Sequence, residues 1–170
     1  MSRHSMVSST ITSFSLASPI GVIADTHGLL RDEALCLLAD CELILHLGDV
    51  GHREDDERIL QRLKGIAPLY AVRGNIDTAA WAERLPDTQD LVVNGWRLHL
   101  VHRLADYDPR TACDAVLHGH SHKPRCEWQD GRLLFNPGAA GKRRFSLPIT
   151  LGKLWADARG LRGAIIHLPL

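Results

Sequence analysis

Short apolar runs rich in valine, isoleucine and leucine alternate with amphipathic or charged stretches from Ile20 onward. Such runs, when bounded by polar turn residues, are typical of buried β-strands. The strands predicted in this way are Ile20–Ala24, Leu43–Leu47, Leu69–Val72, Leu98–Val101, Ala115–Leu117, Leu133–Phe135, Ile149–Trp155 and Ala164–Leu168. The pattern therefore places most of the chain in β-structure.

Two stretches between the first strands have helical periodicity instead. Apolar side chains recur at helical spacing in Leu30–Asp40. Glu54–Leu63 has the same spacing at its apolar positions, with charged residues between them. The resulting β-α-β-α order is typical of an α/β layered domain. After Leu133 the strands follow one another with turn signals between them, so we expect antiparallel strands at the end of the chain.

Composition limits the class of protein. A chain of 170 residues with 45% hydrophobic residues suits one globular domain, and equal numbers of acidic and basic residues give zero net charge. Without a global positive charge, nucleic acid is not an expected partner. The apolar runs fall short of the roughly 20 residues that span a bilayer, so we expect a soluble, cytoplasmic protein. The cysteines form no Cys-x-x-Cys pair and are interpreted as reduced packing residues.

The first 18 residues differ from the rest of the chain. They are rich in serine, lack acidic residues and carry only scattered apolar positions, too few for a signal-peptide core. We predict a flexible tail over residues 1–18 and a single domain over residues 19–170.

Polar residues that could perform chemistry come directly after the predicted strands. Asp25 and His27 follow the first strand, Asp49 follows the second and Asn75 follows the third. Because ligands bind at the carboxyl ends of the strands of an open α/β sheet, we expect these side chains to converge.

Each of these motifs has an ordinary structural explanation when taken alone. Asp and Asn after a glycine commonly cap helices or close turns, and an Asp with a His two residues later is frequent after strands. His120 and His122, which follow Gly119, are a stronger signal, because two imidazoles on one side of an extended segment suit metal ligation.

The order of the motifs adds information that no single motif has. Asp-x-His, Gly-Asp, Gly-Asn, an isolated His102 and Gly-His-x-His occur in this sequence, each at the end of a strand. The chain therefore resembles the calcineurin-like metallophosphoesterase superfamily from about Ile20 to Leu168, and its small single-domain phosphodiesterase branch in particular. Segments 25–28, 74–77 and 136–138 support that branch.

This resemblance implies a fold and a set of metal ligands. The fold would be α/β (α+β): two mixed β-sheets packed as a sandwich flanked by helices, the four-layer metallophosphoesterase fold. The ligands of one metal would be Asp25, His27 and His122, those of the other Asn75, His102 and His120, with Asp49 bridging the two.

The same resemblance implies a reaction. A hydroxide bridging two divalent metal ions would attack a small phosphate ester in line, and we expect a phosphodiesterase. Mixed imidazole, carboxylate and amide ligands suit Mn, Fe, Ni, Co or Zn, with Mn the first choice. Asp49, Asn75 and His120 would then act directly in catalysis.

Three positions depart from the family pattern: Ile76, Arg103 and Ala139. Ile76 stands where many members have a His that assists the leaving oxygen, so monoesters are expected to be poorer substrates than diesters. Asp77 is a candidate substitute proton donor or an orienting partner for a ligand histidine. Ala139 replaces a common serine after Asn-Pro-Gly.

Several arginines are candidates for phosphate contact. Arg103 follows His102 where a glycine is usual, and Arg73 precedes the Gly-Asn motif; a basic run at residues 142–144 invites the same interpretation. Each of them could instead point into solvent as ordinary surface charge.

The main rival is a protein-interaction scaffold that binds metal with little or no catalysis, as in a retromer subunit that resembles this family. The complete ligand set favours an enzyme, whereas Ile76 and Arg103 leave the scaffold as an alternative interpretation. A nuclease would need a basic groove or added domains. The physiological substrate and the oligomeric state stay open, a homo-oligomer included.

Overall fold

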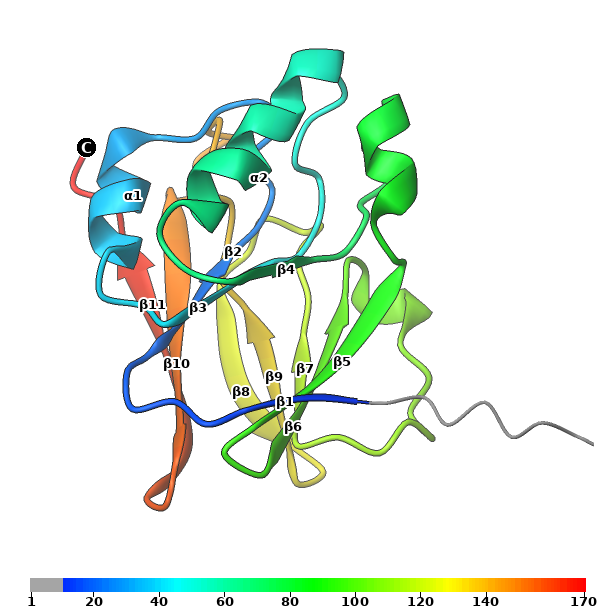
Figure 1. Ribbon diagram of the computed structural model, residues 1–170, viewed down its shortest axis with the longest axis vertical. Helices are drawn as coiled ribbons and strands as arrows, with labels where there is room; N and C mark the ends of the chain where they lie inside the picture. Colours follow the sequence, from blue (N-terminus) through cyan, green and yellow to red (C-terminus); the bar gives the residue numbers. More distant parts are fainter. Residues whose placement is uncertain (1–10) are drawn as a thin grey trace, which may run out of the picture.

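Two mixed β-sheets pack face to face in the computed structural model, which describes residues 11–170 (Figure 1). The six-stranded sheet has the order β1 (Thr12–Phe14), β5 (Thr88–Val93), β6 (Trp96–Val101), β7 (Ala115–Leu117), β9 (Arg132–Asn136), β8 (Arg125–Gln129). The five-stranded sheet has the order β11 (Gly160–His167), β10 (Thr150–Asp157), β2 (Ile20–Ile23), β3 (Leu43–His46), β4 (Leu69–Ala71). The predicted sandwich of two mixed sheets is confirmed.

The five-stranded sheet brings the ends of its first strands to one edge. Strands β2, β3 and β4 are parallel neighbours, while β10 and β11 form an antiparallel hairpin beside β2, as predicted for the end of the chain. Both faces of β2 and β3 are covered, which explains why their sequences are continuously apolar. The shared edge carries the loops that contain Asp25, His27, Asp49 and Asn75, and the three histidines at positions 102, 120 and 122 follow β6 and β7 of the six-stranded sheet.

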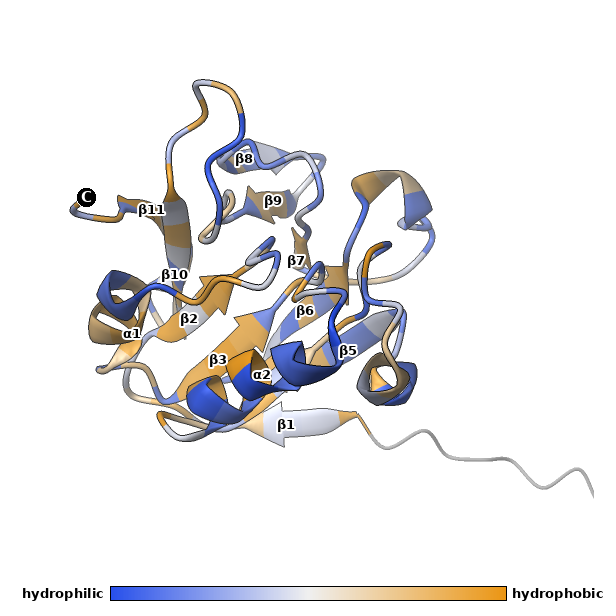
Figure 2. Ribbon diagram, turned by 90° about the horizontal axis from the view of Figure 1, so that it is seen from above, coloured by the Kyte–Doolittle hydropathy of each residue, from blue (hydrophilic) through white to orange (hydrophobic). Residues whose placement is uncertain are grey.

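The helices cover the outer face of the five-stranded sheet. Helix α1 (Asp32–Leu38) and helix α2 (Glu57–Lys64) lie on this face, in the upper left of Figure 1. Helix α2 is amphipathic: Ile59, Leu60 and Leu63 are buried against the sheet, and Figure 2 shows its remaining surface as hydrophilic. Three short 3-10 segments, η1 (Glu54–Asp56), η2 (Ala80–Arg84) and η3 (Leu104–Asp106), complete the connections.

Two apolar cores hold these layers together. One lies between the helices and the five-stranded sheet and includes Ile23 and Ile44. The other fills the space between the two sheets, where Val22 and Leu45 pack with Phe135 from β9. Adjacent residues of β2 thus point into different cores, as the period-two geometry of a strand requires.

Two predictions from the sequence need correction. Residues 12–14, placed in a flexible tail, form β1, which pairs in parallel with β5. Residues 15–18 of that tail are ordered against the domain as well, since the Ser18 N–H donates to Glu42 Oε1 at 2.7 Å, and residues 1–10 lie outside the described residues. Strands β5 and β8 were not predicted, because β5 carries polar side chains on its exposed face and β8 is an edge strand with mostly exposed residues.

The cysteines are all free, as expected, although Cys36 and Cys126 are exposed and only Cys41 is fully buried. Within residues 11–170, no helix is both long enough and apolar enough to cross a membrane.

Candidate metal centre

The predicted ligands lie in loops that follow β2, β3, β4, β6 and β7. Backbone hydrogen bonds join the first two of these loops: the Asp25 N–H donates to the Gly48 carbonyl at 3.0 Å, and the His27 N–H donates to the Asp49 carbonyl at 3.0 Å. The loops are therefore extensions of the parallel pair β2 and β3, which fixes Asp25, His27 and Asp49 relative to one another.

Five of the seven candidate ligands adopt left-handed backbone conformations. The φ angles are +53° at Asp25, +47° at His27, +55° at Asp49, +71° at His120 and +63° at His122. Non-glycine residues rarely adopt this region, and a cluster of such residues is characteristic of functional sites held by the surrounding fold. No sequence pattern signals this feature.

Asp25, His27 and His122 form the first ligand group. One potential ligand atom from each lies within 4.8 Å of the others. Asp25 Oδ1 is 3.8 Å from His27 Nε2 and 3.6 Å from His122 Nε2. Its other oxygen, Oδ2, accepts a hydrogen bond from the His120 N–H at 3.0 Å, which ties the histidine loop to the end of β2.

Asp49, His102 and His120 form the second group by the same criterion. Asn75 joins them: its Oδ1 is 3.0 Å from His102 Nε2 and 3.1 Å from His120 Nδ1. His102 is oriented by its other ring nitrogen, which lies 2.7 Å from the Leu47 carbonyl oxygen. All seven predicted residues thus come together at one edge of the sandwich.

Asp49 lies between the two groups. Its Oδ2 is 3.3 Å from His27 Nε2 and its Oδ1 is 3.3 Å from His102 Nε2. Burial opposes charge on Asp49, yet the two imidazoles outweigh it and hold its pKa well below the usual range. Burial likewise lowers the pKa of His27, but Asp25 and Asp49 together raise it to about 9. The space between these carboxylates therefore favours positive charge.

Buried polar atoms without hydrogen-bond partners provide a test of whether metal fits this site. Among the described residues, four atoms are of this kind: Asp25 Oδ1, His27 Nε2 and His122 Nδ1 in the first ligand group, and His118 Nε2 outside it. Buried polar atoms in proteins are nearly always paired, so three in one cluster need an explanation. Coordination of a cation by carboxylate and imidazole atoms provides one, and the residues present fit a divalent metal.

Two glycines allow the loops to approach this closely. A Cβ at Gly48, whose φ is +97°, would lie 2.6 Å from His102 Nδ1. A Cβ at Gly74 would collide with the Asp49 backbone and carboxylate. The glycines before Asp49 and Asn75 are thus required by the close approach of the loops around Asp49.

His46 and Thr26 form a buried chain of hydrogen bonds beneath the site. The Gly48 N–H donates to His46 Nδ1 at 3.1 Å, so the ring carries its proton on Nε2 and donates to Thr26 Oγ1, also at 3.1 Å. The Thr26 hydroxyl in turn donates to the Val50 carbonyl at 2.8 Å. Burial lowers the pKa of His46 to about 3, which keeps the ring neutral.

We expect His46→Leu to weaken metal binding and stability together, because it leaves the Gly48 N–H without its acceptor and releases Thr26. The free energy of unfolding should fall by about 2 kcal/mol, and metal affinity by about tenfold. Urea denaturation and metal titration measure the two effects. His99→Leu is the matched control: His99 pairs with Asp90 away from the site, so its loss should lower stability and leave metal affinity unchanged.

The hydrogen bonds of Asp77 point to a structural task besides the two roles that the sequence suggested. Its Oδ2 accepts from the Gly74 N–H at 2.7 Å and from the Asp49 N–H at 3.0 Å, and its Oδ1 accepts from the Gly51 N–H at 3.1 Å. Burial raises its pKa, but these three donors favour the ionised form. Asp77 contacts no ligand imidazole; it fastens the Asp49 loop to the Asn75 loop.

Asn136 supports the histidine loop in a similar way. Its Nδ2 donates to the Gly119 carbonyl and to Ser121 Oγ, each at 3.1 Å. Its Oδ1 accepts from the Gly138 N–H at 2.9 Å, which closes the Asn-Pro-Gly turn. The motif thus positions the segment that carries His120 and His122.

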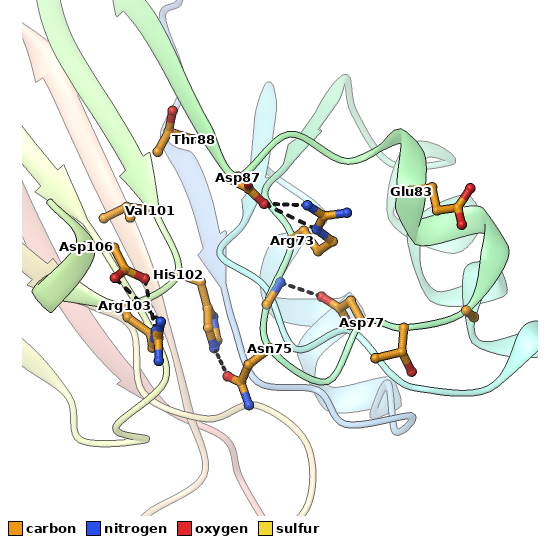
Figure 3. Close-up of a pocket in the computed structure, with 13 residues that line it drawn as sticks. Arg73, Asn75, Asp77, Glu83, Asp87, Thr88, Val101, His102, Arg103 and Asp106 are labelled. Atoms are coloured by element: carbon orange, nitrogen blue, oxygen red, sulfur yellow. Dashed lines mark hydrogen bonds and ion pairs between the residues drawn. The ribbon is translucent and has the colours of Figure 1, made fainter.

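A hollow of about 750 Å³ opens beside Asn75 and His102 (Figure 3). The two predicted phosphate-contacting arginines face it from opposite walls. Arg73 Nη2 is 2.8 Å from Asp87 Oδ1, and Arg103 Nε is 3.0 Å from Asp106 Oδ2. Both guanidinium groups are therefore held by carboxylates beside the centre. Residues 142–144 lie on an exposed loop between β9 and β10.

Known proteins share both the sequence pattern and the fold. The model of the calcineurin-like phosphoesterase superfamily domain matches residues 19–158. A probable metallophosphoesterase from Methanocaldococcus jannaschii is 32% identical over 138 residues, which cover 71% of this chain and 67% of that protein.

Solved structures extend the likeness in fold. The phosphoesterase YfcE from E. coli superposes with a TM-score of 0.67 at 24% identity, covering 88% of this chain and 99% of YfcE. A single mutant of Vps29 from Entamoeba histolytica gives a TM-score of 0.67 at 17% identity, covering 88% of this chain and 98% of that one. One fold therefore accommodates this chain, a phosphoesterase and Vps29.

Proposed function

Since this chain belongs to the calcineurin-like phosphoesterase superfamily, we propose that it hydrolyses phosphodiesters with the help of two divalent metal ions. The observation that carries the proposal is the pair of ligand groups, with Asp49 between them. Such a pair of carboxylate and imidazole clusters suits two adjacent cations, and the unpartnered atoms of Asp25 and His27 support their presence.

Each ligand group would hold one ion. Asp25, His27 and His122 would hold the first, whereas Asn75, His102 and His120 would hold the second and Asp49 would touch both. Manganese is our first choice, because the ligands are oxygen and imidazole nitrogen without thiolate. When bound, such a pair supplies a hydroxide nucleophile at neutral pH and offsets negative charge at phosphorus.

The protein's own residues would position the ester. Asn75, His102 and His120 fix one end of the centre through their mutual contacts. Arg73 and Arg103, facing each other across the adjacent hollow, would orient the phosphate oxygens after exchanging their present carboxylate partners. The backbone strain at five ligands is consistent with a site organised before substrate binds.

We expect diesters to be better substrates than monoesters, because neither of the two positions considered for a proton donor, Ile76 and Asp77, has a side chain free to protonate the leaving oxygen. Ile76 offers none, and Asp77 is occupied by three backbone N–H groups. With the manganese-loaded protein, turnover of a bis-aryl phosphate should exceed that of the corresponding mono-aryl phosphate by about tenfold or more. A preference for the monoester would contradict the diesterase proposal.

A metal-binding scaffold for a protein partner is the second candidate. It is favoured by the fold shared with Vps29 and by the missing proton donor at Ile76. The two candidates differ in a simple way: the scaffold binds two metal ions and turns over no ester, whereas the enzyme turns over diesters only when metal is bound.

A further inference from the structure

We infer that the substrate is an asymmetric phosphodiester, with one arm that is cationic and one arm that carries an additional anionic group. The inference rests on the proposed function, because it places the phosphate at Asn75, His102 and His120. Two hollows flank this ligand group, one of about 750 Å³ and one of about 620 Å³. Each is large enough for a substituent of the phosphate.

The first hollow lies between the loop that follows β4 and the end of β6 (Figure 3). Asn75 and His102 line it on the side of the metal centre. Its arginines are paired with Asp87 and Asp106. Of the two other carboxylates in its wall, Asp77 accepts three backbone hydrogen bonds, and Glu83 is exposed and forms no ion pair among the described residues. The charge of the first hollow that is not neutralised by an ion pair is therefore negative.

The second hollow lies on the other side of His120, between η3 and β8. Arg125 in its wall is paired with Glu127, with 3.1 Å between Nε and Oε2. Lys123 is exposed, and within residues 11–170 no carboxylate lies within ion-pair distance of its ammonium group. The free charge of the second hollow is therefore positive, opposite to that of the first.

Arg103 connects the two hollows. It lines both of them, and its guanidinium is held by Asp106 at 3.0 Å. Asn75 and His102 line the first hollow, and His120 lines the second. Asn75 Oδ1 lies within 3.1 Å of a ring nitrogen of both histidines, so the two hollows meet at this ligand group. A phosphate held there would have one hollow on each side, and its two ester arms would leave in different directions.

Charge complementarity then assigns the arms. The arm in the first hollow would carry an ammonium group attracted by Glu83, which lies at the end of that hollow away from Asn75 and His102 (Figure 3). The arm in the second hollow would carry a carboxylate or phosphate attracted by Lys123. Both side chains are exposed, so each should change affinity by only about threefold to fivefold and lose its effect at high salt.

Binding of four dialkyl phosphates to the manganese-loaded protein tests this assignment. The arms are butyl with butyl, butyl with carboxypropyl, butyl with aminobutyl, and aminobutyl with carboxypropyl; affinities are measured by calorimetry. We expect the last of these to bind most tightly. Lys123→Gln should weaken only the compounds with a carboxylate, and Glu83→Gln only those with an ammonium group. Lys64→Gln, an equal charge change at the end of α2, is the control and should alter none of them.

Equal affinity for all four compounds would overturn the inference, as would variants that affect both kinds of arm alike. Turnover of a bis-aryl phosphate, followed in parallel, keeps the two proposals separate. Turnover without arm preference contradicts this inference alone. Arm preference without turnover contradicts the phosphodiesterase proposal and leaves the assignment of the arms in place.

Discussion

Replacing Asp49 by asparagine should reduce turnover of a bis-aryl phosphate by about a thousandfold, because one charge between the two ligand groups disappears. The asparagine keeps an oxygen that can accept the Ile76 N–H, which now donates to Asp49 Oδ1 at 3.1 Å. The fold should therefore survive while the site loses the carboxylate near His27 and His102. Steady-state kinetics and metal analysis of the purified variant measure both consequences.

Asp106→Asn is the matched control for this experiment. It makes the same chemical change on the exposed side of Arg103, where the carboxylate contacts no candidate ligand. We expect a change in kcat/KM of less than about tenfold. If Asp49→Asn retained wild-type turnover with a full complement of metal, Asp49 would not have the bridging role that we propose.

Replacing Asp77 by alanine should lower the free energy of unfolding by about 3 kcal/mol or more. The reason is that three buried N–H groups, those of Asp49, Gly51 and Gly74, lose their acceptor, and each unsatisfied donor costs about 1–3 kcal/mol. The loops that carry Asp49 and Asn75 would separate, so activity should fall with stability. Urea denaturation with and without metal measures the effect.

Asp77→Asn separates positioning from proton donation. The amide keeps one acceptor oxygen, so stability should fall by less than in the alanine variant, and turnover of a bis-aryl phosphate should stay within about tenfold of wild type. A stable asparagine variant that lost turnover of poorly leaving alkyl esters alone would show instead that Asp77 donates the proton.

The sequence predicts the buried strands well and the exposed ones poorly. Strands β2 and β3 are covered on both faces, so their apolar runs are unmistakable. Strand β8 exposes nearly all its side chains at the edge of a sheet, and its sequence resembles a loop. Strand β1 is only three residues long, and Phe14 is its one side chain packed against the core, which leaves little trace in the side-chain pattern.

At the site, the sequence likewise predicts which residues could be ligands, but it does not predict their backbone conformation or the contacts between their loops. The ligand residues were found because carboxylate, amide and imidazole groups follow the strands in a recognisable order. The left-handed backbone of Asp25 and His27 has no local signal. Nor could the sequence show that Asp77 serves backbone N–H groups, or that Arg73 pairs with Asp87, since both depend on contacts between separate loops.

Metal reconstitution tests the central claim most directly. The purified protein is stripped with a chelator, reloaded with increasing amounts of manganese, and assayed at each step for bound metal and for hydrolysis of a bis-aryl phosphate. We predict that turnover vanishes on chelation and returns in full only when both ligand groups are filled. Turnover that survives chelation, or that is complete with one ligand group empty, would contradict a two-metal centre at Asp49.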